Sequence, residues 1–188
     1  MVSPIYLIAG ALGGAFFLGM LRDQWRTASY LVTLAVLALT SWLAADWAWA
    51  LATGATGAVE ITTAGTPPPF AVNLRLGIAE AALVLLINLT GLLSALYLRD
   101  TMFRQGRRAM AVLLIFIMAL CGIVMTRDLF NLFVFFELVV ISTGGLVLLS
   151  RDGRSLAAGF KFLIASQVVS ILMLVGIIFA YYATGSLN

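Results

Sequence analysis

The sequence predicts an all-α polytopic membrane protein with six transmembrane helices, in a single domain over residues 1–188. Of its residues, 63% are hydrophobic and 10% are charged, whereas a soluble globular domain has roughly 25% charged residues. The mean hydropathy is +1.10. The apolar residues also fall into six segments, each close to the ~20 residues that a helix needs to cross the hydrocarbon core.

Short polar breaks separate these segments, and each is expected to be helical because backbone groups in lipid must satisfy one another. They cover residues 5–21, 29–50, 76–98, 109–125, 129–150 and 156–182. In the first, the stretch "GALGGAFFLG" has the small residues of a close-packing face. Near the end of the second, Trp42, Asp46, Trp47 and Trp49 are typical of the belt at a membrane interface.

The connection over residues 52–73 is the long one. It is rich in Thr, Gly and Ala, shows no apolar period, and contains Pro67–Pro69, which excludes a helix. An external loop without chemistry is therefore expected there.

The positive charges predict the orientation. Nine of the eleven basic residues follow the first, third and fifth segments, namely Arg22, Arg26, Arg99, Arg104, Arg107, Arg108, Arg151, Arg154 and Lys161. Only Arg75 and Arg127 lie on the other side. Because cytoplasmic loops carry the excess of Lys and Arg, both termini are expected outside a cell inner (cytoplasmic) membrane.

The composition also excludes several classes of function. The chain has no His, and its single Cys121 lies in an apolar stretch, so neither a disulfide within the chain nor a metal site is expected. Nothing in the sequence suggests a haem, an iron–sulfur cluster or a nucleotide, so we expect no cofactor and no redox centre. The net charge of +3 belongs to the loops beside the membrane, so no nucleic-acid partner is expected.

The main candidate for function is Glu137, in the middle of "TRDLFNLFVFFELVVISTGG". It lies about 12 Å along its predicted helix, near mid-membrane. An ionised carboxylate there costs a few kcal/mol, which favours a use such as proton transfer. A structural acid that neighbouring helices satisfy by hydrogen bonds is the alternative.

Lys161 is the second candidate for proton translocation, and Glu80 and Gln167 are weaker candidates. Lys161 lies near the start of the last segment, where its stem can reach the interface. Gln167 follows in the same segment and shares a helix face with Ser170. Glu80 lies near the outer end of the third segment, where water can solvate it.

The block "DLFNLFVFFELVVIS" over residues 128–142 resembles the fifth helix of proton-translocating antiporter-like subunits, and most closely the D-type subunit of Mrp-type cation/proton antiporters. Related subunits occur in respiratory complex I and in membrane-bound hydrogenases. The resemblance continues through "GFKFLIASQVVSILMLVGIIFAYYATGSLN" at residues 159–188. It covers residues 109–188 well and the first three helices weakly.

This resemblance implies roles for two positions. Glu137 matches the essential acid, which in the family pairs with a lysine on the seventh helix, and Lys161 matches a frequent basic position early in the sixth. The family has about fourteen helices with two inverted five-helix repeats, so this chain corresponds to the first six. It also has Leu76 in "LRLGIAE", where the family often has an acid next to Gly.

Two hypotheses of function stay open. In the first, the chain is part of a proton- or cation-translocating subunit, with Glu137 as proton relay. Its partners would be other membrane subunits, including a chain that supplies the missing helices, together with protons, Na+ and the lipid bilayer. In the second, it is a structural or assembly subunit with a vestigial acid.

Overall fold

The computed structural model describes residues 2–22, 24–62, 73–149 and 153–187, and most of these are helical. The helices are α1 (Tyr6–Met20), α2 (Arg26–Ala52), α3 (Ile78–Tyr97), α4 (Arg99–Gln105), α5 (Arg107–Met125), α6 (Leu129–Leu148) and α7 (Gly153–Thr184). Two short strands, β1 (Val59–Thr62) and β2 (Asn73–Leu76), pair antiparallel.

Five of the helices, α2, α3, α5, α6 and α7, are long and apolar enough to cross a membrane. The remaining expected span is α1, an apolar helix of 15 residues. At 1.5 Å per residue it is about 22 Å long, which is less than the ~30 Å hydrocarbon core. The predicted all-helical polytopic fold is confirmed, and all six expected segments contain a helix.

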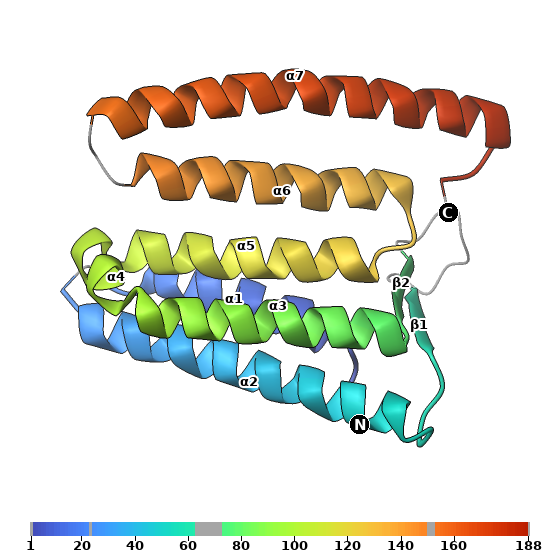
Figure 1. Cartoon of the computed structure of the whole chain (residues 1–188), viewed down its shortest axis with the longest axis horizontal. Helices are drawn as coiled ribbons and strands as arrows, with labels where there is room; N and C mark the ends of the chain where they lie inside the picture. Colours follow the sequence, from blue (N-terminus) through green and yellow to red (C-terminus); the bar gives the residue numbers. More distant parts are fainter. Residues whose placement is uncertain (1, 23, 63–72, 150–152, 188) are drawn as a thin grey trace.

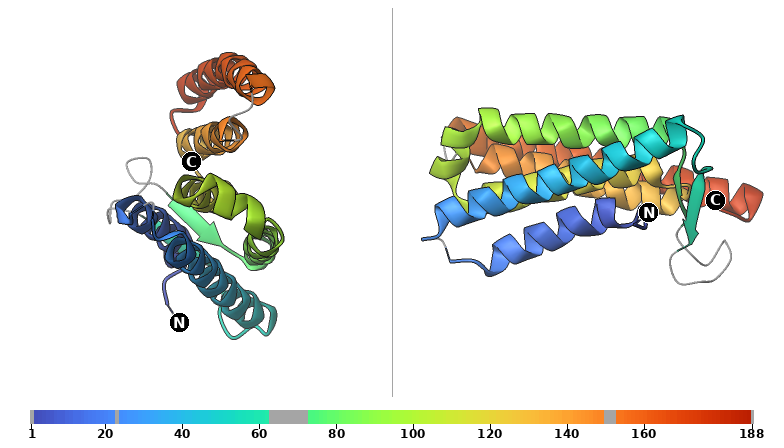
Figure 2. Two further views of the ribbon diagram at one scale, coloured as in Figure 1. Left: turned by 90° about the vertical axis from the view of Figure 1, so that its left-hand side faces the viewer. Right: turned by 90° about the horizontal axis from the view of Figure 1, so that it is seen from below.

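The helices form a four-helix bundle with two further layers on one side (Figure 1). The bundle consists of α1, α2, α3 and α5, and its core contains fully buried residues such as Leu37, Val84 and Leu114. Helix α6 packs on α5, and α7 packs on α6, as the end-on view of Figure 2 also shows. Within the described residues α7 contacts no other helix.

Small residues bring the outer layers together. Gly122 of α5 lies against the ring of Phe135 on α6, and Gly144 of α6 lies against Leu163 on α7. A Cβ atom at either glycine would overlap these side chains. Because lipid tails are as apolar as the helices, such close van der Waals packing is what holds membrane helices together.

The connection expected over residues 52–73 contains regular structure in its described part. Ala52 is the last residue of α2, and β1 pairs with β2 from Val59 opposite Leu76 to Thr62 opposite Asn73. The short strands alternate, with Val59 and Ile61 less exposed than their neighbours. Pro67–Pro69, which are expected to exclude a helix, lie outside the described residues.

The expected bounds also shift at two other places. The third helix begins at Ile78 because Leu76 belongs to β2. The predicted loop over residues 99–108 contains α4, in which Met102 is buried. Arg26 Nη1 of α2 donates a hydrogen bond to the carbonyl of Phe103 in α4 at 3.1 Å.

Candidate functional site

The start of α6 is fixed by a group of hydrogen bonds outside the apolar span. Asp128 caps the helix, with its Oδ1 accepting from the backbone N of Asn131 at 2.7 Å. Asn131 Nδ2 donates to Thr126 Oγ1 at 3.0 Å, and Arg127 N donates to the carbonyl of Asn73 in β2 at 2.9 Å. The helix that carries the candidate acid is therefore anchored to the hairpin.

Glu137 lies on α6, about 12 Å from the start of the helix and about 17 Å from its end. Its side chain is partly buried in the α6–α7 contact. Gln167 Nε2 of α7 donates a hydrogen bond to Glu137 Oε2 at 3.0 Å. Glu137 Oε1 is buried and has no hydrogen-bond partner among the described residues. This oxygen therefore has hydrogen-bonding capacity that nothing in the described chain uses.

Other polar groups occur along the same two helices. Ser170, one turn after Gln167, is 2% exposed, and its Oγ has no partner in the described part of the chain. On the other side of the contact, a groove of about 390 Å³ lies between α6 and α7. It is lined mainly by apolar side chains, together with Thr143 and Ser166. Glu137 does not line this groove, so the acid and the groove are separate features.

Lys161 is not brought to Glu137. Its side chain is exposed and makes no hydrogen bond or ion pair with the described residues. It precedes Gln167 by six residues, which is about 9 Å along the axis and about 1.7 turns, so the two side chains leave α7 on different faces. Because α7 begins at Gly153, Lys161 lies about 12 Å from the helix start.

Glu80 occupies the hairpin end of the molecule. Its Oε2 accepts from the backbone N of Gly77 at 3.1 Å, and its Oε1 pairs with Arg127 Nη2 at 3.3 Å. These contacts join the start of α3 to the connection between α5 and α6. Glu80 thus links the start of α3 to the α5–α6 connection. It is not part of the Glu137–Gln167 contact between α6 and α7.

The sequence does not predict one buried polar pair. Asn88 on α3 is fully buried, and its Nδ2 donates to Val84 O at 2.8 Å and to Cys121 Sγ of α5 at 3.4 Å. The buried state of Cys121 agrees with its apolar surroundings in the sequence. The described residues hold no group of three His, Cys, Asp or Glu side chains suited to a metal.

Comparison with known proteins gives a family match over the last two helices. Residues 126–188 match the transmembrane family described as NADH:quinone oxidoreductase/Mrp antiporter. This match contains the whole of α6 and α7, and therefore both Glu137 and Gln167.

Two curated relatives and one solved structure illustrate the similarity. The chain is 32% identical over 129 residues to the N-type subunit of the NADH-quinone oxidoreductase of Desulforudis audaxviator, covering 66% of this chain and 25% of that protein. It is 29% identical over 134 residues to the D-type subunit of the Na+/H+ antiporter of Bacillus subtilis. That match covers 70% of this chain and 27% of that protein. A chain of the membrane-bound sulfane sulfur reductase, an archaeal respiratory membrane complex, superimposes with a TM-score of 0.88 at 28% identity, covering 97% of this chain and 38% of that one. The chain thus spans about a quarter of the length of these curated relatives.

Proposed function

Because residues 126–188 match the transmembrane domain of the NADH:quinone oxidoreductase/Mrp antiporter family, we propose that the chain is part of a proton- or cation-translocating subunit in a multisubunit membrane complex. The observation that carries the proposal is the Glu137–Gln167 hydrogen bond inside the apolar span. Glu137 is the proposed relay, and Gln167 is its positioning partner.

The chemistry of the pair suits a relay. Gln167 offers a neutral donor that holds one carboxyl oxygen without supplying a charge. The other oxygen, Oε1, is buried and has no described hydrogen-bond partner, so its lone pairs remain available to take up a proton. A carboxyl held in this way keeps its orientation in both protonation states, which a proton relay requires.

The exposed surface of α7 supports partners that supply further helices. Helix α7 packs on α6 alone among the described helices and exposes large apolar side chains along its length, including Ile164, Ile171 and Phe179. The chain also spans only about a quarter of its curated relatives. We therefore propose that another membrane subunit covers α6 and α7, and that Lys161 is a secondary basic site for ions entering from its side of the membrane.

The ions proposed are protons and Na+. One relative is named as part of an Na+/H+ antiporter, and another belongs to an NADH-quinone oxidoreductase. Proton transfer is common to both settings, and the Glu137 carboxyl is the group on this chain that fits it.

One observation favours the alternative of a structural or assembly subunit. Glu137 Oε1 is buried and has no hydrogen-bond partner in the described chain. In that case Glu137 holds α6 against α7 through Gln167, and no proton moves.

Two substitutions at Glu137 separate the functions. Glu137→Gln keeps the volume and cannot release a proton, so ion translocation should fall to background while the complex still assembles. Glu137→Asp keeps the acid and shortens its reach, so partial translocation should remain. Proton or Na+ flux into vesicles that contain the complex measures the first effect, and native gels measure assembly.

Glu60→Gln is the matched control, because it makes the same chemical change at an exposed acid in β1. Its flux should equal that of the unsubstituted protein. The structural alternative predicts the opposite order at Glu137, since a neutral Gln removes a buried charge while Asp breaks the contact. Normal flux in the Glu137→Gln variant would refute the relay.

A further inference from the structure

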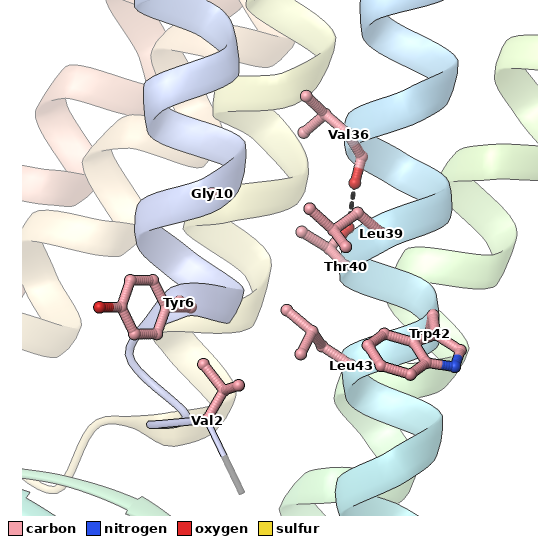
Figure 3. Close-up of a pocket in the computed structure, with 8 residues that line it drawn as sticks. All are labelled: Val2, Tyr6, Gly10, Val36, Leu39, Thr40, Trp42 and Leu43. Carbon is pink, nitrogen blue, oxygen red and sulfur yellow. Dashed lines mark hydrogen bonds between the residues drawn. The ribbon is translucent and has the colours of Figure 1, made fainter.

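An apolar groove of about 310 Å³ lies between α1 and α2, at a distance in the fold from the α6–α7 contact. Figure 3 shows its lining, with Tyr6 and Val2 on one side and α2 side chains on the other. The lining residues are Val2, Tyr6, Gly10, Val36, Leu39, Thr40, Trp42 and Leu43. Thr40 turns its hydroxyl to the carbonyl of Val36 at 3.0 Å, so the groove presents mainly hydrocarbon.

The groove is built into the fold of the two helices. Gly10 has no side chain to fill the space, and a Cβ atom there would meet Thr40 Cγ2 at 3.5 Å. At the hairpin end, the buried Trp47 donates from Nε1 to the carbonyl of Val2 at 3.1 Å. This bond holds the N-terminal segment against α2 and bounds the groove at that end.

An aromatic and acidic stripe continues the groove toward the end of α2. Trp42, Asp46 and Trp49 follow one another at intervals of four and three residues, so they share one helix face. All three are exposed, with Trp42 at 64% and Trp49 at 74%. Asp46 lies about 9 Å before the end of α2, which is near the boundary of the hydrocarbon core for a helix that exceeds the core thickness.

We propose that this surface binds a phospholipid with a primary-amine headgroup. One acyl chain occupies the α1–α2 groove, and the ammonium group lies at Asp46 between the two tryptophans. A carboxylate accepts hydrogen bonds from an ammonium group, and the faces of indole rings attract cations. Asp46 repels anionic headgroups, and a quaternary choline has no N–H to donate to it. A headgroup amine that carries both a positive charge and N–H donors therefore fits Asp46 best, and this selects an ethanolamine-type lipid.

Binding of defined lipids to the full chain tests the proposal. Native mass spectrometry from detergent would compare palmitoyl-oleoyl lipids with ethanolamine, choline and glycerol headgroups. We expect the ethanolamine lipid to be retained most strongly. Asp46→Asn should weaken this retention about fivefold, which matches the loss of about 1 kcal/mol from an exposed ion pair.

Matched variants separate the headgroup from the acyl chain. Asp100→Asn makes the same change on α4, at the other end of the molecule, and should leave retention unchanged. Gly10→Leu should reduce the retention of all three lipids by filling the groove. Gly13→Leu, at a position on α1 with nothing within 4 Å, should not. The unfolding temperature without added lipid should be the same for Asp46→Asn and the unsubstituted chain.

Three results would overturn the proposal. Equal retention of the three headgroups, or retention that Asp46→Asn leaves unchanged, removes the role of the acid. A photo-crosslinker at Tyr6 that captures a protein subunit in native membranes, with no ethanolamine lipid retained, would show that a helix occupies the groove instead.

Discussion

Glu137 receives its hydrogen bond from a neutral amide, although a cation would be the stronger donor. An amide donor fixes the direction of the carboxyl group without fixing its charge. At the scale of the residue, Gln167 is therefore as informative as the acid, because it determines where Oε1 points.

We predict that Gln167→Met lowers ion flux by about tenfold while the complex remains assembled. Methionine keeps the length of the side chain and removes the donor, so Glu137 loses the partner of Oε2 and its orientation. The loss of one hydrogen bond to a charged group costs roughly 1.5–3 kcal/mol, and the lower end of this range corresponds to a tenfold change in rate if the orientation is needed. Flux in vesicles across a range of pH measures it.

Gln105→Met in α4 is the control, since it makes the same change away from the α6–α7 contact. It should leave flux unaltered. A Gln167→Met variant with full flux and an unchanged pH profile would show that Gln167 has no positioning role.

The sequence predicts both members of this pair, but not their contact. Glu137 and Gln167 each stand out as polar residues in an apolar helix. They are 30 residues apart, and their meeting depends on the register of two antiparallel helices. That register is set by the contact of Gly144 with Leu163 and of Gly159 with Leu148, which composition does not encode. Lys161 lies on another face of α7 because it is six residues from Gln167.

At the scale of the element, the contact of α6 with α7 depends on glycine. We predict that Gly144→Ala destabilises the protein by about 1–3 kcal/mol, because the added Cβ overlaps Leu163 and forces the helices apart. Flux should fall as well, since the Glu137–Gln167 bond lengthens. Unfolding in mild detergent, followed by circular dichroism, measures the stability.

Gly176→Ala in α7 is the corresponding control, because a Cβ there meets nothing within 4 Å. It should be neutral or stabilise by up to about 1 kcal/mol, as alanine favours a helix. If both glycine variants were equally stable, the close contact of α6 and α7 would not depend on Gly144.

The elements differ in how well the sequence predicts them. Long apolar segments predict the membrane helices, because length and hydropathy are nearly sufficient in lipid. Helix α4 and the β1–β2 hairpin are too short for such a signal. Their positions follow from contacts made after folding, such as the bridge of Leu74 to Thr126 and the bond of Arg26 to Phe103 O.

At the scale of the whole molecule, the two ends differ in charge and in structure. The end that carries α4 has more arginines than the hairpin end. Two of them also join elements: Arg26 donates to the carbonyl of Phe103, and Arg107 donates to the carbonyls of Leu18 and Gly19. The hairpin end has Arg75 and Arg127, of which Arg127 pairs with Glu80.

We predict that the α4 end faces the cytoplasm. A cysteine introduced at Arg104, in a Cys121→Ser background, should react with a membrane-impermeant thiol reagent only in inverted vesicles, because Arg104 is exposed at that end. Glu60→Cys, at the hairpin end, should react only in intact cells. Strong labelling of Arg104→Cys from outside the cell would reverse the orientation.

The anchoring of α6 at Thr126–Asp128 has a consequence for the geometry of the acid. The backbone N–H of Arg127 donates a hydrogen bond to the carbonyl of Asn73 in the hairpin. This bond fixes the rotation of α6 about its own axis at a point about 12 Å from Glu137. Deleting a single residue between this anchor and Glu137 would rotate the acid by about 100° around the helix axis. It would also move the acid about 1.5 Å along the axis toward the anchor. The carboxyl would then leave the sector that faces α7. The direction in which Glu137 points from its helix is thus set by main-chain hydrogen bonds at the end of the span.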